Sequence, residues 1–293
     1  MRPRREPGPS RQDTGVSEAG SCPLFAEFEM PLSRLRLAAA STALLTAACA
    51  APAAQAATPA PPPAGAAFDY QIGGAYDPPE GVKVVTRDHG TAPAKGLYNI
   101  CYVNAFQAQP GAEGEWDDDL LLRDASGNVV MDGDWGEALL DVGTAGKRTR
   151  IAAKVDSWID ECAAKGYQAV EPDNFDSFTR SDGLLTDADA QDYIKLLSAH
   201  AHEKGLAIAQ KNTSELSARH TQNGLDFAVA EECGEQHNCG EFTAAFGDHV
   251  IVIEYTAEGL SYACGHWPRL SIVRRDHDVV TPDDAENYVR ETC

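Results

Sequence analysis

The sequence has 293 residues, of which 45 are acidic and 24 basic, so its formal net charge at pH 7 is -21. Hydrophobic residues make up 43% of the chain, which is enough for a packed core and excludes a chain that is disordered throughout. The negative charge argues against nucleic acid and against an anionic membrane surface as partners. It suits a cationic or neutral ligand, or serves only to keep the surface solvated.

Three segments precede the part of the chain that we expect to fold. Residues 1–29 are polar and irregular, and we interpret them as an upstream extension before a true start at Met30. Residues 30–56 are typical of a secretory signal peptide, with arginines before an alanine-rich apolar run and a small-x-small cleavage site. The run is too short for a stable membrane span, and Cys49 is an alternative lipidation site. Residues 57–66 form a linker rich in Pro and Ala.

Residues 67–293 are expected to form one secreted domain, because short apolar runs alternate there with segments of helical periodicity. Two of those segments, Arg148–Lys165 and Asp187–Lys204, predict helices, the second capped by Thr186 with Asp189 three residues on. Eight runs predict strands: Phe68–Ile72, Val82–Arg87, Leu97–Ala105, Tyr167–Pro172, Leu206–Lys211, Phe227–Glu231, Val250–Tyr255 and Leu270–Arg274. This alternation favours an α/β fold, a single-domain (β/α)8 TIM barrel.

Six cysteines follow the linker, and an even number in a secreted chain predicts up to three disulfides. Cys233 and Cys239 are the favoured pair, because the residues between them would close a small loop. A metal site that includes His237 is the alternative for these two. The pairing of the other four is open: Cys101, Cys162, Cys264 and Cys293.

Polar side chains, many of them carboxylates, stand at or near the ends of the predicted strands. The carboxyl ends of barrel strands meet at one rim, and carboxylates are costly to bury unless they are paired. Each one alone could equally be a helix cap. Together they predict one acidic mouth, formed by Asp69, Tyr70, Tyr102, Glu171, Asp173, Asn174, Asp176, Lys211, Asn212, Glu231, Glu232, Glu254 and Tyr255.

The familiar metal, nucleophile and nucleotide motifs are missing from the sequence. It contains no His-Glu-x-x-His, no Gly-x-Ser-x-Gly and no Gly-x-Gly-x-x-Gly loop followed by a suitable acid. We therefore expect no metal and no cofactor. Two carboxylates that face each other across a glycosidic bond are sufficient for its hydrolysis.

Four motifs occur in a fixed order: Glu171-Pro172-Asp173-Asn174-x-Asp176, Gln210-Lys211-Asn212, Ala230-Glu231-x-Cys233 followed by Cys239, and Ile253-Glu254-Tyr255. This set resembles glycoside hydrolase family 114, the endo-α-1,4-polygalactosaminidases, and the strand spacing extends the resemblance from about Phe68 to Arg275. The resemblance implies a barrel, a galactosamine-rich substrate, and catalytic residues at Asp173 and Glu231. Glu232 stands where the family often has Gln, which leaves the acid/base role open between Glu231 and Glu232.

We assign Asp173 as the nucleophile and Glu231 as the general acid/base of a retaining, endo-acting hydrolase. The other residues of the mouth are expected to bind the sugar, although Lys211 could instead hold Asp173 ionised. Trp116 and Trp135, in the long segment after the third strand, are expected to wall the groove. The expected partner is a cationic aminosugar polysaccharide, attracted by the acidic mouth, and the protein is expected to be a monomer.

Two other functions compete with this interpretation. A metal-dependent phosphodiesterase would need a divalent ion on Glu171 and Asp173 and a basic phosphate clamp, for which the chain offers Lys211, Arg274 and Arg275. A carbohydrate-binding barrel without catalysis would need neither. The presence of both proposed catalytic carboxylates counts against the second alternative.

Overall fold

The structure is a computed structural model that describes residues 59–293. The predicted extension 1–29 and signal peptide 30–56 lie outside the described residues, and so do the first two residues of the predicted linker 57–66. Within the described part, no helix has the length and apolar character needed to cross a membrane.

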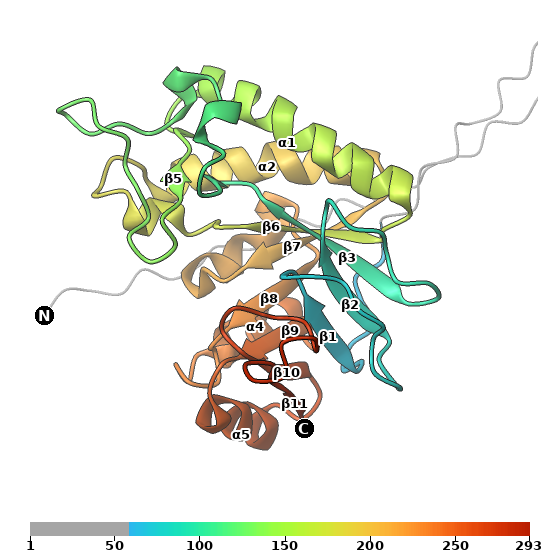
Figure 1. Cartoon of the computed structure of the whole chain (residues 1–293). Helices are drawn as coiled ribbons and strands as arrows, with labels where there is room; N and C mark the ends of the chain where they lie inside the picture. Colours follow the sequence, from blue (N-terminus) through green and yellow to red (C-terminus); the bar gives the residue numbers. More distant parts are fainter. Residues whose placement is uncertain (1–58) are drawn as a thin grey trace, which may run out of the picture. The chain divides into compact units, whose positions relative to one another are not determined.

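Eight parallel strands form one continuous sheet, in the order β1-β2-β3-β6-β7-β8-β9-β10. Their bounds are β1 Phe68–Gln71, β2 Val84–Asp88, β3 Tyr98–Asn104, β6 Ala169–Asp173, β7 Ala207–Lys211, β8 Phe227–Glu231, β9 Val250–Glu254 and β10 Ser271–Arg275. The sheet curls strongly, so that β1 returns to lie beside β10 (Figure 1). The predicted α/β fold is confirmed as a TIM-barrel-like sheet, and each predicted strand lies within a few residues of an observed one.

The two predicted helices are present and begin where a threonine caps them. Helix α1, Ala145–Lys165, starts three residues earlier than expected, because the Thr144 hydroxyl accepts the N–H of Lys147 at 3.4 Å. Helix α2, Asp187–Glu203, starts with the predicted capping box of Thr186 and Asp189. These two helices pack side by side on the outside of the sheet (Figure 1).

The strand–helix alternation is incomplete in the first third of the described chain. Within that part, no α-helix separates β1, β2 and β3, and the chain after β3 makes a long excursion before α1. This excursion contains a small antiparallel pair, β4 (Gln107–Ala108) and β5 (Ala138–Leu139). Shorter helices follow the later strands: α3 His220–Asn223, α4 Cys239–Phe246 and α5 Ala257–His266.

The alternation of side chains along each strand produces two separate apolar layers. One layer fills the inside of the curl and includes Phe68, Ile100 and Phe227. The other lies between the sheet and the helices and includes Val170 and Val252. Successive residues of a strand point to opposite faces of the sheet. A residue that lies an even number of positions along the strand from a member of the inner layer therefore also faces inward.

A last strand and three disulfides complete the domain. Strand β11, Arg290–Thr292, pairs antiparallel with β10, and the Arg290 guanidinium bonds the Asp69 carboxylate on β1 at 2.9 Å. This contact helps to close the ring between β10 and β1. The disulfides are Cys101–Cys162, Cys233–Cys239 and Cys264–Cys293.

The described part of the predicted linker contacts the folded domain. The Tyr98 hydroxyl donates to the carbonyl oxygen of Ala60 at 2.8 Å. The ring nitrogen Nδ1 of His249 lies 3.1 Å from the carbonyl oxygen of Pro62. Pro62 is buried. Residues 59–66 therefore pack against the barrel, although their composition alone suggested a segment with no means of packing.

Candidate active site

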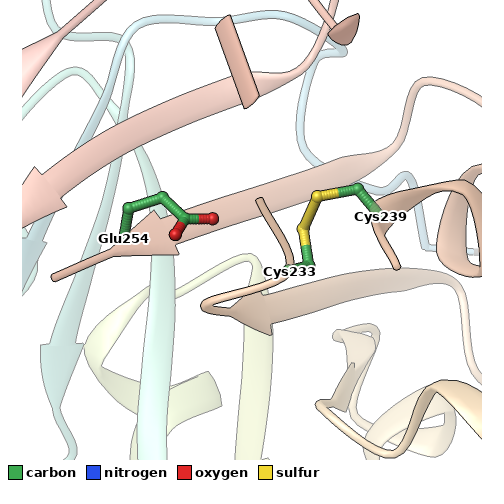
Figure 2. A group of neighbouring side chains, drawn as sticks. All are labelled: Cys233, Cys239 and Glu254. Atoms are coloured by element: carbon green, nitrogen blue, oxygen red, sulfur yellow. A yellow bond between two sulfur atoms is a disulfide. The ribbon is translucent and has the colours of Figure 1, made fainter. Parts of the chain in front are cut away.

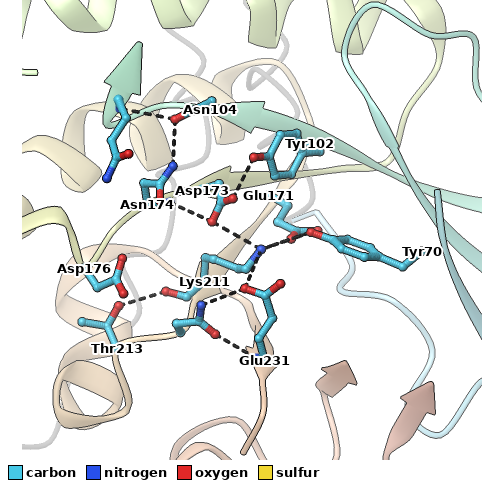
Figure 3. A network of polar contacts seen from close by, with 12 residues as sticks. Tyr70, Tyr102, Asn104, Glu171, Asp173, Asn174, Asp176, Lys211, Thr213 and Glu231 are labelled. Atoms are coloured by element: carbon cyan, nitrogen blue, oxygen red, sulfur yellow. Dashed lines mark hydrogen bonds and ion pairs between the residues drawn. The ribbon is translucent and has the colours of Figure 1, made fainter. Parts of the chain in front are cut away.

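Six inward-facing side chains meet at the carboxyl ends of the strands. Each lies an even number of residues from an inward-facing apolar residue of the same strand. Asp173 is four residues after Ala169, Lys211 four after Ala207, and Glu231 four after Phe227. Tyr70 on β1, Tyr102 on β3 and Tyr255 after β9 follow the same rule. Figure 3 shows the Asp173, Lys211 and Glu231 side chains converging from neighbouring strands.

Lys211 is the centre of this cluster and is shielded from solvent. Its Nζ lies 3.0 Å from an oxygen of Glu171, and 3.3 Å from an oxygen of Asp173 and from one of Glu231. Burial alone would lower the pKa of Lys211, but the carboxylates of Asp173, Glu231 and Glu171 outweigh burial and raise it well above its ordinary value. Lys211 is therefore a permanent cation beneath three acids.

The Asp173 carboxylate is fixed from several directions. The Tyr102 hydroxyl donates to Oδ2 at 2.7 Å, and the backbone N–H of Asn174 donates to Oδ1 at 2.8 Å. Lys211 approaches the same Oδ1. Three contacts on one short side chain leave it little rotational freedom, which suits a group that must attack along one direction.

Glu231 is held by a two-point contact with Asn212. The amide nitrogen of Asn212 donates to Glu231 Oε2 at 3.0 Å, while its amide oxygen accepts the backbone N–H of Glu231 at 2.8 Å. The Tyr255 hydroxyl donates to the other carboxylate oxygen. Both ends of the carboxylate are therefore directed by neighbours on the adjacent strands.

The backbone leaves the strands in an unusual conformation beside these acids. Asn174, Asn212, Thr213 and Glu232 all have a positive φ, between 48° and 67°. This left-handed region is uncommon for non-glycine residues and costs on the order of 1–3 kcal/mol each. The turns occur directly after Asp173, Lys211 and Glu231, so they set where the strand-end side chains stand relative to the cavity.

A cavity of about 590 Å³ opens above the cluster, and its lining is strongly acidic. Asp173 and Glu231 face into it with side-chain exposures of 18% and 21%, whereas Lys211 is only 1% exposed and lies beneath. The acidic side chains of the lining are Asp88, Glu137, Asp173, Asp176, Glu215, Glu231, Glu232 and Asp278. Among the described residues, Arg180 is the one Lys or Arg in this lining.

One wall of the cavity comes from residues that the sequence did not single out. Glu137, at the end of the excursion, accepts the amide groups of Asn104 at 2.8 Å and Asn174 at 3.2 Å through one carboxylate oxygen. Burial raises the pKa of Glu137, although the bond from Asn104 opposes the shift. The Arg180 guanidinium donates two hydrogen bonds to the Asp176 carboxylate, at 2.8 and 2.9 Å, and both residues line the cavity.

An aromatic contact joins two loops at the edge of the cavity. The rings of Trp135 and His277 stack with their planes 2° apart and their centres 5.0 Å apart, and both line the cavity. Trp135 is 52% exposed, as expected for a residue that walls a groove. The expectation for Trp116 was wrong, because this side chain is buried between Trp158 and Lys154, away from the cavity.

The predicted mouth residues divide into three groups by position. Tyr102, Asp173, Asn174, Asp176, Asn212, Glu231, Glu232 and Tyr255 line the cavity. Tyr70, Glu171 and Lys211 form a buried layer below it, in which the Tyr70 hydroxyl donates to Glu171 at 3.0 Å. Asp69 and Glu254 lie elsewhere, Asp69 paired with Arg290 and Glu254 directed at the Gly234 backbone.

Glu254 lies beside the short disulfide, as Figure 2 shows. The sulfurs of Cys233 and Cys239 and a Glu254 oxygen lie within 4.8 Å of one another, a set that could hold a metal if the thiols were free. The two sulfurs are bonded to each other, so they cannot both serve as thiolate ligands. The arrangement therefore does not fit the alternative of a metal site here.

The Glu254 carboxyl also makes stability depend on pH. Burial raises its pKa from 4.5 to about 7, although the N–H of Gly234 opposes the shift. The folded state keeps this proton at pH values where the unfolded state has lost it, so stability should fall as pH rises from about 4.5 to about 7. Glu254→Gln should flatten this part of the profile, measured as the free energy of unfolding in urea.

Glu286→Gln is the matched control for Glu254→Gln, because Glu286 is an exposed glutamate and is not among the groups that shift the pKa of Glu254. We expect this variant to keep the wild-type slope. Parallel profiles for the wild type and Glu254→Gln would show that Glu254 does not retain its proton in the folded state.

Among the described residues, the cavity presents accessible carboxylates, Asp173 and Glu231 among them, but no phosphate clamp. Arg274 bonds Glu291 at 2.7 Å, and Arg275 is buried and bonds the backbone oxygens of Val289 and Val280. Neither arginine lines the cavity, and Arg180, which does, forms an ion pair with Asp176. The basic residues of the phosphodiesterase alternative are therefore not available to a phosphate in the cavity, which leaves acid–base and nucleophilic chemistry by carboxylates.

Comparison with known proteins places this site in a family. Residues 49–293 match glycoside-hydrolase family GH114. Ega3 from Aspergillus fumigatus, solved with galactosamine, is 22% identical with a TM-score of 0.65, over 79% of this chain and 96% of Ega3. The glycoside hydrolase domain of PelA from Pseudomonas aeruginosa is 14% identical with a TM-score of 0.49, over 73% of this chain and 95% of that domain.

At 22% identity the likeness to Ega3 bears only on the fold, and the comparison with curated proteins gave no match. The family match covers the entire described domain, including every strand of the sheet. The chain belongs to glycoside hydrolase family GH114.

Proposed function

We propose that the protein is a secreted, endo-acting glycosidase that cleaves α-1,4-linked, galactosamine-rich polysaccharide. In this proposal Asp173 is the nucleophile and Glu231 is the general acid/base. One observation carries it: both carboxylates line the same acidic cavity, and each has an oxygen 3.3 Å from the ammonium of Lys211. A glycosidic bond in the cavity would therefore have a carboxylate on either side.

The spacing of the two acids is compatible with a reaction with retention. Because Asp173 Oδ1 and Glu231 Oε2 are each 3.3 Å from the same nitrogen, they can be no farther apart than twice that distance. Retaining enzymes keep their carboxyl groups about 5–5.5 Å apart, while inverting enzymes need about 6.5–9.5 Å to admit a water. The upper limit here falls at the bottom of the inverting range.

In the proposed reaction Glu231 protonates the glycosidic oxygen while Asp173 attacks the anomeric carbon. The bond to the departing sugar breaks, and an ester links Asp173 to the remaining chain. Glu231 then takes a proton from water, whose oxygen attacks the same carbon and releases Asp173. Tyr102 and the Asn174 N–H hold Asp173 ready for both steps.

The charge of the cavity supports a substrate with free amines. Galactosamine carries a protonated amine, and an acidic concave surface attracts such groups and raises their local concentration. N-acetylation removes that charge. Ega3 was solved with galactosamine, which agrees with this substrate class.

Purified protein should cleave deacetylated α-1,4-galactosamine polymer and leave the fully acetylated polymer intact. KM for the cationic polymer should rise with added salt, because screening weakens the attraction of the acidic cavity. Product sizing will report internal cleavage, and NMR of the first products will report the anomer. Equal cleavage of both polymers would contradict the role of the amines, and a first product with inverted configuration would contradict the role of Asp173.

A further inference from the structure

We propose that the buried ammonium of Lys211 is a shared counter-ion, pairing with Asp173 and with Glu231 in turn as negative charge moves between them during catalysis. This inference rests on the proposed function and adds a positioning residue that contacts no sugar. It starts from the number of partners that surround one nitrogen (Figure 3).

Lys211 has fewer N–H groups than partners. An ammonium has three donors and no acceptor. Two are directed at the buried layer: Nζ donates to the Tyr70 hydroxyl at 3.1 Å and to Glu171 at 3.0 Å. The remaining donor faces two catalytic carboxylates at an equal distance of 3.3 Å. It can make a good hydrogen bond to only one of them at a time.

The proposed reaction moves one negative charge between these two carboxylates. At the start Asp173 is ionised and Glu231 carries the proton. When Asp173 forms its ester and Glu231 gives its proton to the leaving oxygen, the charge passes to Glu231. Hydrolysis of the ester returns the charge to Asp173 and a proton from water to Glu231. Lys211 is equally close to the charge in both states, so no cation has to move into or out of the site.

The buried layer keeps Lys211 available for this role. Burial raises the pKa of Glu171, although Lys211 opposes the shift, and one Glu171 oxygen has no hydrogen-bond partner. Tyr70 and Glu171 take two of the three N–H groups of Lys211 and hold the ammonium below the catalytic pair, so its third N–H is directed at the two catalytic carboxylates.

The test is the pH profile of kcat/KM for Lys211→Met, which removes the charge and keeps a similar shape. The acidic limb of the profile reports ionisation of the nucleophile, and the alkaline limb reports loss of the acid's proton. Because an opposite charge at this distance favours the ionised form, its removal should move both limbs to higher pH, by roughly 1–3 pH units. Loss of a preorganised charge should also lower kcat by about 10²- to 10³-fold.

Lys154→Met is the matched control, since Lys154 lies on α1 with its ammonium 4.3 Å from the centre of the Trp116 ring. It removes the same charge outside the cavity, and both limbs should stay in place. If Lys211→Met does not fold, the double variant Glu171→Gln/Lys211→Met removes the buried ion pair as a unit and should show the same displacement.

Each result has a definite reading. Displacement of both limbs supports the shared counter-ion. Displacement of the acidic limb alone would mean that Lys211 serves Asp173 only. Displacement of neither limb would mean that Lys211 has a structural role. Each of these two results overturns the inference, while the proposed function stands. A wild type that does not cleave the polymer overturns the proposed function and, with it, this inference.

Discussion

Replacing Asp173 by asparagine should lower kcat on deacetylated galactosamine polymer by about 10⁴-fold or more, because removal of a nucleophile abolishes the covalent route. The variant should keep the melting temperature of the wild type nearly unchanged. Asparagine has the same shape: its amide oxygen can still accept the Asn174 N–H, its amide nitrogen can donate to the Tyr102 hydroxyl, and Lys211 keeps Glu171 and Glu231 as partners. Reducing-end release and calorimetry will measure the two quantities.

Asp248→Asn is a suitable control for this experiment, since Asp248 pairs with Arg269 on the surface and does not line the cavity. It makes the same chemical change without touching the site. Full activity in Asp173→Asn would remove Asp173 from catalysis. Loss of activity in this variant accompanied by a large fall in melting temperature would point to a structural role for Asp173 instead. A wild-type protein that binds the polymer without cleaving it would favour a carbohydrate-binding barrel.

Glu231→Gln is expected to lower polymer hydrolysis by about 10²- to 10⁴-fold, the usual contribution of a positioned acid/base. A substrate with a good leaving group should lose less in the first step, because that group departs without a proton. Added azide should then accelerate turnover by attacking the ester that water no longer reaches efficiently. The azide product should have the same anomeric configuration as the substrate, which NMR can establish.

Glu232→Gln separates the two neighbouring acids. Burial and the nearby charges of Glu235 and Glu231 raise the pKa of Glu232, which is the direction that a general acid requires. Only Glu231, however, contacts Lys211, Asn212 and Tyr255. We therefore expect Glu232→Gln to lose far less activity than Glu231→Gln and to gain nothing from azide. The opposite ranking would make Glu232 the acid/base.

The sheet was predictable because buried parallel strands are short apolar runs, and eight of these stand out in the sequence. Helix α2 was predictable to within a residue, since Thr186 and Asp189 make a capping box that depends on local sequence alone. The excursion between β3 and α1 was not, because its fold depends on contacts such as Asp132 with Arg180, which lie far apart in the chain.

The rule that polar residues at strand ends form one site was too coarse. It selected Asp69 and Glu254 together with Asp173 and Glu231, although their positions on their strands have the opposite parity. Tyr70 and Ile253 face the inside of the curl, so their neighbours Asp69 and Glu254 face away from it. Counting in twos from the apolar positions of each strand would have separated these residues without any structure.

Glu137, Arg180 and His277 carried no signal that sequence reasoning could use. They lie outside the strands and the α-helices, in segments too irregular for a period to relate one side chain to the next, and they reach the cavity only because the chain between strands returns there. The loop residue Trp135 was anticipated for its residue type, while Trp116, chosen by the same reasoning, is buried against α1.

The left-handed turns after Asp173, Lys211 and Glu231 bear on any attempt to make this protein tolerate heat. Glycine at positions 174, 212 or 232 would adopt the same backbone without the steric penalty of a side chain. Laboratory evolution toward a higher melting temperature should therefore enrich Glu232→Gly, which relieves the strain without deleting a side-chain hydrogen bond of the described residues. Asn174→Gly and Asn212→Gly would relieve the same strain but delete the amides that hold Glu137 and Glu231, so at these two positions a strained backbone is retained together with a fixed active site.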